Sequence, residues 1–163
     1  MHHNIVLIDD NFAIRQIIKI FLARVSRKYS FDLNIYTSDN GVEGLGYVFI
    51  TNPNIIIIDT TLPKYSGKDI IQFFVQNKKF SSGEIAVIVL EEYPRKKFNL
   101  PNNFYRINKN KQNAFDQLTD ILIEKLNISD YGRMSRLYDA LGGFVMKNSN
   151  KGDLISQKIS KEI

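Results

Sequence analysis

The hydrophobic positions of this chain alternate between short unbroken runs and longer stretches with helical spacing. Unbroken runs occur at residues 5–8, 55–58 and 85–90, and the second of them is four consecutive isoleucines. Runs of this length without polar alternation are typical of strands buried on both faces of a parallel sheet. Residues 31–36 predict a more alternating strand, and residues 104–107 predict a short fifth one.

Between these runs, apolar residues recur at the spacing of amphipathic helices. The predicted helices cover residues 12–25, 42–50, 68–76 and 112–126. Asp10 or Asn11 is suited to cap the first of them, because both side chains accept hydrogen bonds from free backbone N–H groups. The chain is therefore expected to alternate strand and helix from its first residues to about residue 126.

This alternation predicts an α/β fold, a doubly wound parallel sheet with right-handed crossovers. Only thirteen residues, two of them prolines, separate Leu90 from Phe104, so a helix there has one or two turns at most. Residues 1–127 are predicted to form this domain. Residues 128–163 are predicted to form a helical C-terminal extension, because their apolar residues again repeat at helical spacing.

Composition fits one globular domain with an extension. The chain has 163 residues, 44% of them hydrophobic, and contains no apolar run near the length of a membrane span. Its start lacks the charged and apolar regions of a signal peptide. Cysteine is absent, which excludes disulfides and thiolate chemistry, and we expect a cytoplasmic protein. The two histidines, His2 and His3, argue against a histidine metal site or a Ser-His-Asp triad.

The net charge is +5, without a dense basic block. A modest excess of this kind is typical of a solvated surface. Nucleic acid is therefore a disfavoured partner, and no membrane partner is expected.

Acidic residues follow two of the predicted buried strands. Asp9 and Asp10 end the first strand, and Asp59 ends the third. These strands are neighbours in a doubly wound sheet, so the three carboxylates should lie close together and repel one another unless a cation intervenes. Oxygen ligands of this kind suit Mg²⁺. Lys109 follows the fifth strand and would point into the same crevice, which completes a set of groups suited to phosphoryl transfer.

With these residues the chain resembles the receiver domains of two-component response regulators, the CheY-like fold. The resemblance covers residues 4 to about 127. It is carried by the stretch from Ile5 to Asn11, by Asn40, Gly41 and Glu43, by the stretch from Ile55 through Asp59, Pro63 and Gly67, and by Lys109. It implies a flavodoxin-like five-stranded sheet of order 2-1-3-4-5.

The resemblance also implies roles for individual residues. Asp59 would be the phosphoacceptor, attacking a phosphohistidine of a histidine kinase or phosphotransfer protein, and Lys109 would pair with the phosphoryl group. Asp9, Asp10, Asp59 and the backbone carbonyl of Thr61 would hold Mg²⁺. The output would be contact with a downstream protein target. Such a protein is not an enzyme beyond catalysing its own phosphorylation.

The chain departs from the family at the positions that report phosphorylation. Receivers place a hydroxyl residue at the end of the fourth strand, where this chain has Glu91, and an aromatic three residues before the lysine, where it has Arg106. A carboxylate beside a phosphoryl group is repelled by it. Glu91 is therefore expected either to form a salt bridge with Arg106 or Lys109, replacing the hydroxyl–aromatic switch, or to point to solvent.

Two classes of function are open at this point. The first is a phosphoaccepting receiver with an unusual output face. The second is a receiver-shaped interaction module that works without phosphorylation. The extension has alternatives of its own: it packs back on the receiver, it forms a homodimer through residues 129–163, or it contacts DNA through the basic residues Arg133, Arg136, Lys147 and Lys151.

Overall fold

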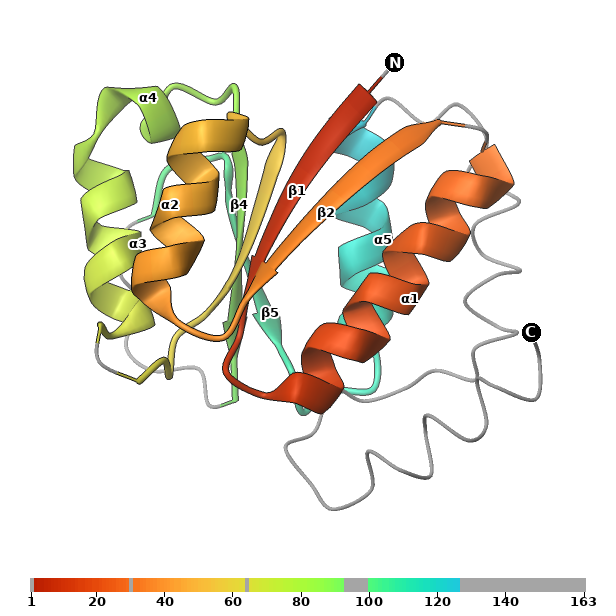
Figure 1. The fold of residues 1–163 in the computed structure, drawn as a ribbon, viewed down its shortest axis with the longest axis horizontal. Coiled ribbons are helices and arrows are strands. Elements are labelled where there is room, and N and C mark those ends of the chain that lie inside the picture. The colour runs from red at the N-terminus through yellow and green to blue at the C-terminus, as the bar shows by residue number, and fades with distance from the viewer. Residues whose placement is uncertain (1, 30, 64, 93–99, 127–163) are drawn as a thin grey trace.

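In a computed structural model, the described residues 2–29, 31–63, 65–92 and 100–126 form a parallel sheet between two layers of helices (Figure 1). The five strands of this part of the chain are β1 (His2–Ile8), β2 (Asp32–Ser38), β3 (Ile55–Asp59), β4 (Ala86–Glu91) and β5 (Phe104–Asn108). Their order is β2-β1-β3-β4-β5, and every neighbouring pair is parallel. The doubly wound fold predicted from the sequence is confirmed.

The helices cover both faces of this sheet. They are α1 (Phe12–Tyr29), α2 (Gly41–Thr51), α3 (Gly67–Gln76), α4 (Lys78–Ser81) and α5 (Ala114–Lys125). Helices α1 and α5 lie on one face, and α2, α3 and α4 lie on the other (Figure 1). The order of the elements along the chain, strand then helix, places the carboxyl ends of all five strands at one edge of the sheet.

The isoleucines of β3 lie at the centre of both hydrophobic cores. Ile55 and Ile57 face α1 and α5, whereas Ile56 and Ile58 face α2 and α3, and all four have no exposed surface. Side chains of a strand alternate between the two faces of a sheet, so a strand covered on both faces requires an apolar residue at every position. This explains the unbroken hydrophobic run.

The structure differs from the sequence prediction at the ends of several elements. Strand β1 begins at His2 rather than Ile5, because its polar residues pair with β2 and with the loop before β3: Asn34 Nδ2 donates to Asn4 Oδ1 at 3.0 Å, and the Asn4 N–H donates to Asn54 Oδ1 at 2.9 Å. Helix α5 begins at Ala114, two residues later than predicted.

Helix α4 was not predicted. It is a single turn whose first backbone N–H groups are capped by Asn77, which accepts a hydrogen bond from the Lys79 N–H at 3.1 Å. Its one buried residue is Phe80, and the buried side chain of Asn103 donates to the carbonyl oxygens of Phe80 and Ile85, both at 2.6 Å. These two hydrogen bonds fix the approach to β4.

Two predictions fall outside the described residues. The short helix expected between β4 and β5 falls mainly within residues 93–99, and the C-terminal extension falls within residues 127–163. Within the part of the chain that the structure describes, no helix combines the length and the apolar character that crossing a membrane requires.

Candidate functional site

The sheet brings the predicted acidic residues together at the carboxyl ends of β1 and β3. These strands are hydrogen-bonded neighbours, with Ile8 aligned with Ile58, so Asp9 and Asp59 leave the sheet side by side. Lys109 follows β5 directly, and its backbone N–H donates to the Glu91 carbonyl oxygen at 2.7 Å. The end of β5 is thereby tied to β4, and the lysine side chain reaches back toward β3.

A buried lysine joins two buried carboxylates in this site. Lys109 Nζ lies 3.1 Å from Asp59 Oδ2 and 3.7 Å from Asp9 Oδ2. The exposed fractions of the three side chains are 0%, 1% and 0%. A charge this deeply buried persists only when an opposite charge lies beside it. The pairing therefore couples the three residues into one electrostatic unit.

Two neighbouring groups orient the carboxylates, and a third holds the backbone of Asp9. The Asn11 N–H donates to Asp9 Oδ1 at 2.8 Å, the Thr61 hydroxyl donates to Asp59 Oδ2 at 2.8 Å, and Arg15 Nη1 donates to the Asp9 carbonyl oxygen at 2.5 Å. Asn11 also caps α1, since its side-chain oxygen accepts a hydrogen bond from the Ile14 N–H at 3.2 Å. The sequence reasoning included Thr61 only for its carbonyl and overlooked Arg15.

The carboxylates offer a set of ligands for a cation. One oxygen each from Asp9, Asp10 and Asp59 lies within 4.8 Å of the others, and Asp10 is exposed whereas the other two are buried. Within the described residues, Asp9 Oδ2 and Asp59 Oδ1 are buried oxygens that have no hydrogen-bond partner. Buried polar atoms are otherwise almost always satisfied. The two oxygens are therefore suited to bind a positively charged group that enters the site.

Asp9 carries an unfavourable charge in this site. Burial raises the pKa of its carboxyl from 3.8 to about 7, and the charges of Asp59 and Asp10 act in the same direction. Lys109 and the N–H of Asn11 lower this pKa, but they offset only part of the cost of burial. A proton or a cation at Asp9 therefore relieves an unfavourable charge.

Gly67, the first residue of α3, lies against the backbone of Asp59. A Cβ atom at this position would lie 1.8 Å from the Asp59 carbonyl oxygen and 2.9 Å from Thr60 Cα. Only glycine permits so close an approach. Ser66 caps α3 here by accepting a hydrogen bond from the Lys68 N–H at 3.2 Å. The glycine thus allows α3 to begin directly against the end of β3, where Asp59 lies.

The two positions where the chain departs from the receiver pattern form an ion pair. Arg106 Nη1 lies 3.0 Å from Glu91 Oε1, and the side chains are 28% and 12% exposed. Glu91 is aligned with Asn108 and Arg106 with Val89, so the pair runs diagonally across β4 and β5 on one face of the sheet. Of the arrangements considered from the sequence, the structure therefore contains the pair with Arg106.

We expect this pair to make a measurable but modest contribution to stability. A double-mutant cycle with Glu91→Ala and Arg106→Ala should give a coupling energy of about 0.5–1 kcal/mol in urea denaturation, because Arg106 is partly solvated. The coupling should fall as salt is added. A coupling energy of zero at low salt would show that the pair does not hold the two strands in solution.

Comparison with known structures identifies the fold. The chain has the fold of response regulator receiver domains, the CheY-like fold. One similar structure is the signal receiver domain of an HD domain-containing protein from Pseudomonas fluorescens, with a TM-score of 0.59 and 16% identity; the match covers 78% of this chain and 99% of the other. Chemotaxis response regulator CheY4 of Vibrio cholerae matches with a TM-score of 0.56 and 17% identity, over 75% and 100% of the two chains.

A third structure has the same fold. It is the response regulator domain of CheB from Thermotoga maritima, with a TM-score of 0.56 and 13% identity over 78% of this chain and 96% of the other. No protein-family model matches the sequence, and no curated protein matches it. At these identities the likeness establishes the fold, and the function has to be argued from the site.

Proposed function

We propose that this protein is a response regulator receiver that accepts a phosphoryl group on Asp59 and signals through protein contact. The observation that carries the proposal is the buried Asp59 carboxylate, held 3.1 Å from Lys109 Nζ at the carboxyl edge of the sheet, with Asp9 and Asp10 beside it. A carboxylate is a usable nucleophile toward phosphorus when the charge of the incoming group is neutralised. Lys109 supplies one positive charge for that task, and a cation held by the acidic cluster would supply the rest.

In the proposed reaction, an Asp59 oxygen forms a bond to the phosphorus of a phosphohistidine as the phosphorus–nitrogen bond breaks. The electron pair of that bond stays on the imidazole nitrogen, which takes up a proton. Lys109 and the Thr61 hydroxyl hold Asp59 Oδ2 in place, so the carboxylate cannot rotate freely. After transfer, Lys109 can pair with a phosphoryl oxygen, because an acyl phosphate carries its negative charge there.

Mg²⁺ fits the acidic cluster. Asp9, Asp10 and Asp59 provide carboxylate oxygens, which are ligands that this ion prefers, and the unpartnered buried oxygens of Asp9 and Asp59 are the ones that require a cation. By resemblance, the Thr61 carbonyl completes the set. When bound, the ion would neutralise charge on the phosphoryl oxygens.

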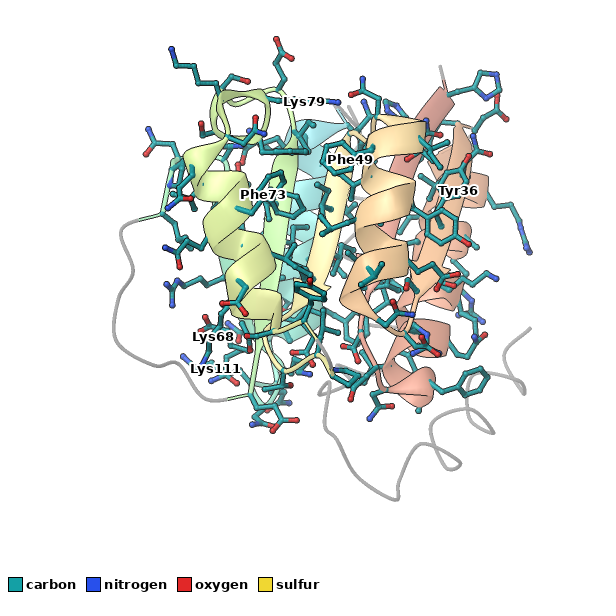
Figure 2. The ribbon with its side chains drawn as sticks, turned by 60° about the vertical axis from the view of Figure 1, so that its left-hand side comes forward. Tyr36, Phe49, Lys68, Phe73, Lys79 and Lys111 are labelled. Carbon is teal, nitrogen blue, oxygen red and sulfur yellow. The ribbon has the colours of Figure 1, made fainter. Side chains whose placement is uncertain are left out.

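The proposal implies a histidine kinase or phosphotransfer protein as the phosphodonor and a downstream protein as the target, in the cytoplasm. The protein would catalyse only its own phosphorylation. Figure 2 shows Lys68 and Lys111 at the end of the molecule that carries the carboxyl ends of the strands. Positive charges near the site favour the approach of an anionic donor.

Phosphorylation is tested on the full chain with a small phosphodonor such as acetyl phosphate. We expect the wild-type protein with Mg²⁺ to gain the mass of one phosphate, and Asp59→Asn to gain none. Asp10→Asn should be labelled much more slowly, because it loses a metal ligand and not the nucleophile. Absence of labelling, under conditions that label an ordinary receiver, would sink the proposal and leave the interaction module as the explanation of the fold.

A further inference from the structure

The ion pair of Glu91 and Arg106 belongs to the end of β4 and to β5, and the backbone at the end of β4 lies beside the proposed phosphorylation site. Leu90, the residue before Glu91, is the strand partner of Asp59. The carbonyl oxygen of Glu91 accepts a hydrogen bond from the Lys109 N–H at 2.7 Å, and the side chain of the same lysine contacts Asp59. The backbone of Glu91 is therefore tied both to the strand of the phosphoacceptor and to its lysine.

A phosphoryl group on Asp59 changes the electrostatics of this pair. It adds negative charge and three acceptor oxygens near a carboxylate that is only 12% exposed. Two like unit charges about 4 Å apart repel by about 4 kcal/mol at an effective dielectric of about 20. The charge of Glu91 therefore becomes unfavourable in its present position, because a side chain this little exposed is poorly screened by water.

The arginine has the opposite preference. A guanidinium group binds phosphate oxygens through paired hydrogen bonds, and the higher charge of the phosphoryl group makes it a stronger partner than a single carboxylate. Arg106 comes from β5, but its Nη1 atom already contacts the side chain of Glu91 on β4. The next strand, β3, lies one interstrand spacing of about 4.8 Å further on. Val89, the strand partner of Arg106, faces α2 and α3, whereas Leu90, the strand partner of Asp59, faces α1 and α5, so the exchange requires the long Arg106 side chain to pass around the carboxyl end of β4.

We propose that Arg106 is a phosphoryl-binding residue that Glu91 holds in the unphosphorylated protein. On phosphorylation its guanidinium passes from the Glu91 carboxylate to the phosphoryl group, and Glu91 is released from its partner. This inference rests on the proposed function, since it needs an anion on Asp59. It makes the exchange of one ion pair for another the event that reports phosphorylation in this chain.

The probe for this exchange is beryllium fluoride with Mg²⁺, which coordinates a carboxylate oxygen and presents a tetrahedral anion like a phosphoryl group. Its affinity is measured by calorimetry for the full-length protein and for Glu91→Gln, with and without Arg106→Gln. Glu91→Gln alone should bind the probe about tenfold more tightly, because Arg106 no longer has to leave a carboxylate. Adding Arg106→Gln to Glu91→Gln should weaken binding about tenfold or more.

The Glu91→Gln background separates direct contact from general electrostatics. If Arg106 touches the bound anion, Arg106→Lys in that background should restore only part of the affinity, because lysine keeps the charge without the paired hydrogen bonds. A change smaller than about twofold on adding Arg106→Gln would overturn the inference while the proposed function stands. Absence of Mg²⁺-dependent binding by the wild-type protein would overturn both. Circular dichroism confirms that each variant is folded.

Discussion

Replacing Gly67 by alanine is expected to destabilise the protein by about 3 kcal/mol or more and to abolish phosphorylation at Asp59. The added Cβ would meet the Asp59 carbonyl oxygen at 1.8 Å, so the two backbone segments cannot both keep their positions. A clash with a flexible side chain can be relieved by a rotamer change, but this clash is with backbone. Helix α3 must move away, and the loop after Asp59 must move with it.

The effect is measured by urea denaturation and by mass after incubation with a phosphodonor. Gly46→Ala is the matched control. Gly46 lies within α2, and a Cβ atom there would meet nothing within 4 Å. That substitution should stabilise the protein by up to about 1 kcal/mol, because alanine is the better helix former. If both alanine variants have the stability of the wild type, the close approach of α3 to Asp59 does not exist in solution.

The strands were predictable because burial on both faces dictates composition. The run of isoleucines from Ile55 to Ile58 admits few other readings, and its position among the helices predicts a central strand. The start of β1 was harder to predict. His2, His3 and Asn4 are polar, and they extend the strand only because β2 offers partners across the sheet. Such pairing depends on residues about thirty positions away, which local patterns do not report.

The sequence predicts which residues form the site, but only some of the contacts between them. Strand ends carrying Asp9, Asp59 and Lys109 must converge in this topology, and they do. The Thr61 hydroxyl and the guanidinium of Arg15 were missed because their roles depend on side-chain direction. Arg15 lies six residues after Asp9 on the helix that follows it, and this spacing was the available signal.

An exposed aromatic pair on the surface of α2 and α3 plays no part in the proposed function. Phe49 of α2 and Phe73 of α3 lie side by side, with ring centroids 6.2 Å apart, and are 52% and 39% exposed (Figure 2). Both rings pack against Phe80, which is fully buried. The pair therefore extends the hydrophobic core to the surface between the two helices, and its packing stabilises α4 as well.

Replacing Asp9 by asparagine is expected to raise the free energy of unfolding in neutral and basic solution when divalent cations are absent. The pKa of Asp9 is raised from 3.8 to about 7 in the folded protein. Between these values the folded state holds a proton that the unfolded state has lost, so stability falls as the pH rises through this window. Above it, the full penalty of a buried carboxylate is present, about 4 kcal/mol for a shift of about three units.

Asparagine keeps the shape of the side chain and can still accept the hydrogen bond of the Asn11 N–H, but it carries no charge. Urea denaturation in a chelating buffer at about pH 5 and about pH 8 should therefore show a difference in stability between variant and wild type that grows by about 2–3 kcal/mol at the higher pH. Groups common to both proteins cancel in this comparison. A difference that stays constant between the two conditions would show that Asp9 does not carry the penalty.

Adding Mg²⁺ should make the wild-type protein more stable than Asp9→Asn. A cation at the acidic cluster favours the charged form of Asp9, so its binding energy adds to the stability of the wild-type protein, by RT ln(1 + [Mg²⁺]/Kd) for a single site. The variant has lost one ligand and should gain much less. The increase on adding Mg²⁺ should also be larger at about pH 8 than at about pH 5, because at the lower pH the ion must displace a proton from Asp9. An equal increase for both proteins would place the ion elsewhere.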